Sequence, residues 1–165
     1  MKYKYLRFFK DIKIDDVPQV GGKNASLGEM FRVLTPKGIN LPNGYSTTAD
    51  SYYYFLDSTG IRDKIAAILD GLEVTDVADL QKRGAEVRQL ILDTPLPEDF
   101  VEEITTGYQE LCDLLDYQDV VVAIRSSATA EDLPNASFAG QQEAYLNISG
   151  IEQVLESAHK CIASL

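Results

Sequence analysis

The sequence predicts an α+β fold, in which a helical subdomain is combined with a mainly antiparallel sheet. Between residues 61 and 115, apolar side chains recur at steps of three and four, which is the spacing of one helical face. A β-branched apolar run at 120–124 and a second apolar run at 143–148 then predict two strands joined by a turn region. With 165 residues and 45% hydrophobic content, the chain can bury one core, so we expect one domain or a large part of one.

The elements predicted before residue 60 are short. A helix is predicted over 26–34, because apolar side chains at positions 27, 30, 31 and 34 share one face. Residues 39–47 predict an interrupted or edge strand with a turn, since Pro42 lies within them. Thr48 can cap a following helix at 49–56. That helix carries three consecutive tyrosines, at 52, 53 and 54, so at least one of them faces solvent or a partner.

Longer elements follow. Helices are predicted over residues 61–72, 77–92 and 97–115. The run at 120–124 is continuous rather than alternating, which is typical of a central strand buried on both faces. After the returning strand at 143–148, a last helical pattern from Val154 to Ile162 shows no capping glycine before the sequence ends. We therefore expect this chain to be truncated relative to a longer protein.

Composition excludes several classes of protein. Acidic residues outnumber basic ones by 26 to 15, a formal charge of −11, which leaves no basic stripe for nucleic acid. No apolar run reaches the roughly 20 residues of a membrane span, and the N-terminus lacks the apolar core of a signal peptide. A cytoplasmic protein is therefore predicted. Cys112 and Cys161 lack CxxC spacing and are expected to be free thiols.

Two segments could hold an anion, and the first begins at Arg125. This arginine follows the apolar run directly, so it either reaches solvent at the rim or meets a ligand at the edge of the sheet. Hydroxyl side chains come next, and the turn at 137–142 offers backbone N–H groups that can point at an anion. The candidate ligand-binding residues of this turn are Ser137, Ala139, Gly140 and Gln141.

The second candidate segment precedes the first predicted helix. Gly21 and Gly22 permit a tight turn, the helix N-terminus supplies N–H groups, and Lys23 adds a cation. It is not a Walker A loop, because Asn24 stands where that motif needs serine or threonine. A glycine turn into a helix with a solvated lysine is the alternative interpretation.

Three stretches carry a family resemblance: VGGKNASLGEM (20–30), GINLPNGYSTTADSYYYFL (38–56) and VAIRSSATAEDLPNASFAGQQEAYLNI (122–148). They resemble the amino-terminal nucleotide-binding region of the phosphoenolpyruvate synthase and pyruvate phosphate dikinase family. The resemblance covers nearly the whole chain. The same region also occurs in rifampin phosphotransferases, so it identifies the ATP module better than the final phosphoryl acceptor.

The resemblance implies that residues 1–165 form the amino-terminal part of an ATP-grasp domain, with ATP held between two α+β subdomains. It implies a phosphotransferase that converts ATP, pyruvate and water to phosphoenolpyruvate, AMP and phosphate through a phosphohistidine on another domain. It also implies that Lys23 and Arg125 contact phosphates and that Gly140 lies in the loop over them. Members of the family usually carry threonine at the position of Ala144, so this chain lacks a hydroxyl there that could contact the nucleotide.

What this chain lacks follows from the same resemblance. The phosphohistidine domain, the pyruvate-binding domain and the ligands of Mg²⁺ are all expected in the missing part of the parent, so no catalytic or metal-binding residue is expected here. His159, the single histidine, matches no family motif and is predicted to be a packing or surface residue. The isolated piece is expected to be inactive. The alternatives are a rifampin phosphotransferase-like ATP module and a non-catalytic module that binds nucleotide or a protein partner.

Overall fold

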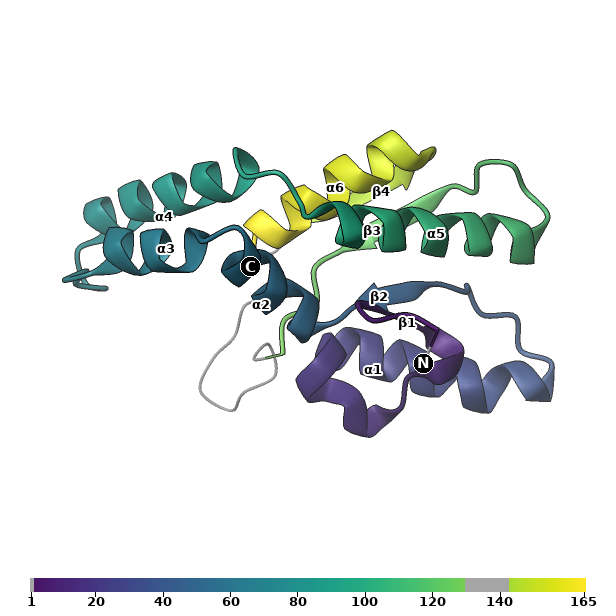
Figure 1. Ribbon diagram of the computed structural model, residues 1–165. Helices are drawn as coiled ribbons and strands as arrows, with labels where there is room; N and C mark the ends of the chain where they lie inside the picture. Colours follow the sequence, from purple (N-terminus) through teal and green to yellow (C-terminus); the bar gives the residue numbers. More distant parts are fainter. Residues whose placement is uncertain (1, 130–142) are drawn as a thin grey trace.

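The computed structural model describes residues 2–129 and 143–165, and within these ranges the fold is a mixture of helices and small antiparallel sheets, as predicted (Figure 1). The helices are α1 (Val17–Leu34), α2 (Ala49–Ser58), α3 (Ile61–Leu69), α4 (Val77–Leu92), α5 (Glu98–Leu115) and α6 (Ile151–Ala163). Antiparallel pairing joins β1 (Leu6–Phe8) to β2 (Tyr45–Thr47), and β3 (Val122–Arg125) to β4 (Ala144–Ile148). Short 3₁₀ turns cover Phe9–Asp11, Ile14–Asp16 and Thr35–Lys37.

Helix α5 supplies the centre of the main hydrophobic core. Its apolar side chains repeat at helical spacing, and Phe100 and Ile104 are fully buried. They pack in one cluster with Tyr5 from the N-terminal segment and Phe55 from α2. Figure 1 shows α5 on one side of the β1–β2 pair and α1 on the other. The helix predicted at 97–115 is therefore confirmed.

Helix α1 differs from the predicted helix in both its start and its buried face. It begins at Val17 rather than at residue 26. The apolar face predicted from periodicity is partly open, since Leu27 is 38% and Met30 is 41% exposed. Small residues face the protein instead: a Cβ at Gly28 would lie 2.5 Å from the Cβ of Ile12. The helix packs closely through residues without bulk, which a hydrophobicity pattern does not register.

The β3–β4 hairpin corrects a second prediction. Strand β4 is the predicted returning strand, and it pairs with β3 in the register Val122 with Ile148 and Arg125 with Ala144. The expectation that the run at 120–124 is buried on both faces is wrong for this structure, because Val121 is 63% exposed. On β4, Leu146 is 60% exposed. One face of the hairpin packs on the main core and the other faces outward, as is common for antiparallel strands.

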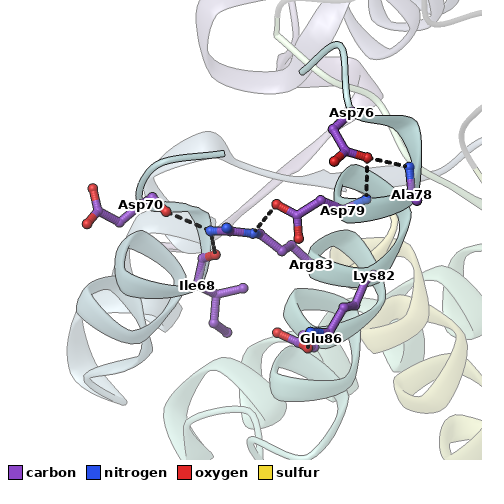
Figure 2. Close-up of polar contacts among 8 residues, drawn as sticks. All are labelled: Ile68, Asp70, Asp76, Ala78, Asp79, Lys82, Arg83 and Glu86. Atoms are coloured by element: carbon purple, nitrogen blue, oxygen red, sulfur yellow. Dashed lines mark hydrogen bonds and ion pairs between the residues drawn. The ribbon is translucent and has the colours of Figure 1, made fainter. Parts of the chain in front are cut away.

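Helices α3 and α4 form a hairpin at one end of the fold, where α4 also packs against α6 (Figure 1). Figure 2 shows how Arg83 of α4 holds the end of α3: its guanidinium donates to the carbonyl oxygens of Ile68 (2.9 Å) and Asp70 (2.6 Å). The same group pairs with Asp79 at 2.8 Å. The Asp76 side chain caps α4 by accepting from two backbone N–H groups. Helix α3 ends at Leu69, three residues before the predicted end.

The predictions for α2, its tyrosines and the two cysteines are confirmed. Helix α2 is capped by Thr48, whose side chain accepts from the Ser51 backbone N–H. Of the three tyrosines, Tyr53 is half exposed, whereas Tyr52 and Tyr54 pack against the main core. Cys112 and Cys161 are free and buried. In the part of the chain that the structure describes, no helix is both long and apolar enough to span a membrane.

Candidate functional site

The described residues of the two segments predicted to hold an anion lie side by side. The Lys23 Nζ atom, on α1, donates to the backbone carbonyl oxygen of Ser126 at 3.3 Å. Ser126 immediately follows Arg125, the last residue of β3. Lys23 and Arg125, more than 100 positions apart in sequence, are thus brought into the same region, because the Lys23 side chain contacts the residue that follows Arg125.

Gly21 shapes the α1 side of this junction. Its dihedral angles, φ 78° and ψ 162°, break the helical geometry, so a new helical segment begins at Gly22. Non-glycine residues rarely adopt this conformation. The first N–H groups of a helical segment have no partner within it and carry a partial positive charge, which favours an anion nearby. Lys23 lies in this first turn, with its side chain exposed.

Ser127 closes the junction from the β3 side. Its hydroxyl donates to the Val20 carbonyl oxygen at 3.0 Å. Its backbone lies directly over Gly21, where an added Cβ would come within 2.5 Å of the Ser127 carbonyl oxygen and closer still to the hydroxyl. The contact therefore requires glycine at position 21 for two reasons: the left-handed backbone angle and the lack of space.

Asn24 ties the same turn to the first sheet. Its side-chain amide donates to the Val20 carbonyl oxygen at 3.0 Å and to the Ser46 hydroxyl at 2.8 Å. Ser46, in β2, is buried and donates in turn to the Thr47 carbonyl oxygen. The start of the helical segment is consequently fixed to β2 as well as to the residues after β3.

Arg125 lies at the open face of the hairpin. It is exposed, and it makes no ion pair within the described ranges. Its register partner on β4 is Ala144, which is also exposed and presents only a methyl group. The next residue, Ser126, is buried, and its backbone N–H donates to the Glu143 carbonyl oxygen at 3.4 Å. The backbone around Arg125 is thus held on both sides, while its side chain is open to a ligand.

The remaining sequence-predicted site residues fall elsewhere. Ser137, Ala139, Gly140 and Gln141 lie outside the described residues. His159 is a packing residue, as predicted: its Nε2 atom lies 2.8 Å from the Ile91 carbonyl oxygen, and its ring meets Phe55 edge-on. Within the described part of the chain, no group of three or more His, Cys, Asp or Glu residues could hold a metal ion.

Sequence reasoning missed two members of the junction. The sequence pattern does not mark the side chain of Asn24 or that of Ser46 as part of a contact. For Asn24 a signal exists, because asparagine side chains often form hydrogen bonds with backbone groups a few positions away, such as the carbonyl of Val20. Nothing local marks Ser46, because its partner lies 22 positions away.

The structure has two hollows of about 400 Å³ in its described part, and the first reaches Glu143, whose carbonyl oxygen accepts from Ser126. One is lined by Arg88, Tyr145 and Lys160 together with the acidic Glu143, among others. The other lies at the N-terminus, where Glu110 pairs with Lys2 and Lys10. Lys23 and Arg125 line neither hollow, and each hollow contains its own balancing carboxylate.

Comparison with known proteins gives a consistent result. Residues 17–165 match the family described as the pyruvate phosphate dikinase, AMP/ATP-binding domain. The chain is 55% identical to a phosphoenolpyruvate synthase of Aquifex aeolicus, over 94% of this chain and 18% of that protein. It is 50% identical to one of Neisseria meningitidis, over 100% of this chain and 21% of that protein. With one of Escherichia coli the identity is 45%, over 96% of this chain and 20% of that protein. The chain spans about a fifth of these relatives.

Proposed function

The chain belongs to the pyruvate phosphate dikinase, AMP/ATP-binding domain family, and from this membership we propose that it holds the phosphates of ATP at the junction of α1 and β3. The proposed binding residues are Lys23 and Arg125, together with Ser137, Ala139, Gly140 and Gln141 of the following loop. The observation that supports this assignment most directly is the contact of the Lys23 ammonium with the carbonyl of Ser126, next to Arg125.

We further propose that this chain is the amino-terminal ATP-binding portion of a phosphoenolpyruvate synthase. The relatives described above carry that name, and they favour pyruvate over rifampin as the final acceptor. The reaction would convert ATP, pyruvate and water to phosphoenolpyruvate, AMP and phosphate through a phosphohistidine on another domain. In the finer fold assignment, these residues would form part of an ATP-grasp domain, with the rest of the nucleotide cleft supplied by the parent.

The two cations would act by positioning and by stabilising charge. In phosphoryl transfer, negative charge is spread over the oxygens of the moving group, and preorganised cations and N–H donors lower its energy. Arg125 presents a planar fork that can bind two phosphate oxygens, whereas Lys23 presents a compact charge beside the helix N-terminus. Magnesium would accompany the nucleotide. The described residues do not include a group of ligands that could hold it.

Removal of either cation tests this proposal in the full-length protein. We expect Lys23→Ala and Arg125→Ala each to slow ATP-dependent phosphorylation of the histidine about 100-fold in a single turnover, because each removes one preorganised charge contact. Both side chains are exposed, so the melting temperature is expected to stay near that of the wild type.

Lys37→Ala is the matched control, since Lys37 is also an exposed lysine of this region but lies beyond the end of α1. It is expected to leave the rate unchanged. A wild-type rate in Lys23→Ala or Arg125→Ala would remove that residue from the proposed site.

A further inference from the structure

We infer that Ser127 and Gly21 are positioning residues that set where Lys23 stands relative to Arg125. The inference rests on the proposed function and deepens it. Neither residue carries a charge. They would act by holding the turn before Lys23 against the residues after Arg125. The contact consists of the Ser127 hydroxyl on the Val20 carbonyl oxygen and the Ser127 backbone packed on Gly21.

The geometry leaves this junction little freedom. The Val20 carbonyl oxygen accepts from Ser127 and from the Asn24 side chain, both at 3.0 Å, so its position is fixed from two directions. At Gly21 the Ser127 backbone lies closer than any Cβ would allow. Gly21 and Val20 are buried, whereas Lys23 and Arg125 are exposed. Buried backbone that is held by these contacts therefore supports two exposed cations.

A fixed junction is what phosphate positioning needs. A lysine side chain is flexible, so the positions that its ammonium can reach depend mainly on where the backbone of the residue lies. Lys23 lies two residues after Gly21, and Arg125 lies two residues before Ser127. A shift of about 1 Å in a group that orients a substrate can slow a reaction about 100-fold. Loosening the junction would therefore move Lys23 relative to Arg125, whose own backbone is held by its pairing with β4.

The test is a double-mutant cycle in the full-length protein, with Ser127→Ala and Lys23→Ala made singly and together. We expect Ser127→Ala alone to slow single-turnover phosphorylation of the histidine by about tenfold at saturating ATP, since it removes one hydrogen bond that sets the geometry. In the Lys23→Ala background it should slow the reaction by less than about twofold, because the cation that it positions is gone. A merely structural role would give the same factor in both backgrounds.

Ser149→Ala is the control: Ser149 also donates to a backbone carbonyl, that of Asp119, in the segment that joins β4 to α6. It should leave all rates unchanged. Gly21→Ala should slow the reaction more than Ser127→Ala, because it meets both a steric clash and an unfavourable φ. If Ser127→Ala does not fold, Ser127→Cys, which is similar in size and a weaker donor, takes its place in the cycle.

The outcomes separate this inference from the proposed function. A wild-type rate in Lys23→Ala would remove Lys23 from the proposed site and would overturn the positioning role with it, whereas wild-type rates in both Lys23→Ala and Arg125→Ala would overturn the proposed site itself. A slow Lys23→Ala combined with a wild-type rate for Ser127→Ala, or with equal factors in the two backgrounds, would overturn the positioning role alone.

Discussion

Single carboxylates of α5 hold the N-terminal segment in place. The Glu103 carboxylate accepts from the backbone N–H groups of Tyr5 (2.6 Å) and Leu6 (3.0 Å). The Asp99 carboxylate accepts from the hydroxyls of Tyr5 (2.8 Å) and Tyr54 (3.0 Å), so it joins this segment to α2. These hydrogen bonds lower the pKa of Asp99, chiefly through Tyr5. The same group of residues raises the pKa of Tyr54 to about 12, through its hydrogen bonds with Tyr5 and Asp99.

This raised pKa predicts a loss of stability in alkali. The ordinary pKa of tyrosine is 10.0, so between pH 10 and about 12 the unfolded chain releases the Tyr54 proton while the folded chain retains it. The free energy of unfolding therefore falls as pH rises through this window, and the contribution is fully present below pH 10. We expect Tyr54→Phe to show a flatter dependence there, measured by urea unfolding at a series of pH values.

The neighbouring Tyr53→Phe provides the control, because Tyr53 lies in the same helix with a half-exposed ring. It should retain the wild-type dependence on pH. Identical curves for Tyr54→Phe and the wild type would contradict the role assigned to the hydroxyl of Tyr54.

At the scale of elements, the side chain of Arg83 ties α4 to the end of α3. Arg83 satisfies carbonyl oxygens at the end of α3 that have no partner within the helix, and it does so from α4 (Figure 2). Arg83→Ala is expected to lower the melting temperature by a few degrees and to speed amide exchange in α3. Lys82→Ala should do neither, because Lys82 only pairs with Glu86 of its own helix, at 3.9 Å. Equal melting temperatures and equal amide exchange in the two variants would contradict the role of Arg83 in holding α3.

Elements defined by local signals were predictable from the sequence. Helices α2 and α4 begin where Thr48 and Asp76 cap them, and the interior of α5 follows its helical period. Strand β1 was not predicted, because three residues are too few to show an alternating pattern. Within 39–47 only Tyr45–Thr47 pairs as a strand, since β1 offers no longer partner. These differences are set by tertiary contacts rather than by local preference.

The candidate site also has a part that the sequence predicts and a part that it does not. Lys23 and Arg125 could be selected from their charge, their place beside predicted elements and the family resemblance. The contact of Ser127 with Val20 could not be selected, because it joins residues 107 positions apart through a hydroxyl and a backbone carbonyl. The steric role of Gly21 against Ser127 likewise depends on which backbone lies opposite, and a single sequence does not specify that.

At the scale of the whole molecule, the described residues contain two separate hydrophobic cores. The main core surrounds α5, whereas a small core consists of Phe9, Ile12, Val20 and Ala25, with Val17 and Phe31 partly buried against it. Helix α1, which carries Lys23, contributes to the small core. Arg125 ends a strand that packs on the main core. The proposed phosphate site therefore spans the boundary between the two, and polar contacts such as that of Lys23 with Ser126 connect them there.

This division predicts uneven local stability, because little buried apolar area holds α1 in place. In the full-length protein we expect the amides of α1 to exchange with solvent faster than those of α5. A ligand that contacts both sides of the boundary stabilises the state in which α1 is packed against the residues after β3. ATP at about 100 times its dissociation constant should therefore slow amide exchange in α1 by up to about 100-fold. Helix α4 packs against α3 and α6 rather than against α1, so it serves as the internal reference, whose exchange should not respond to ATP (Figure 1). Equal exchange of α1 and α5 without ligand would mean that the two cores open as one cooperative unit, and an equal response of α1 and α4 to ATP would mean that the nucleotide does not act at this boundary.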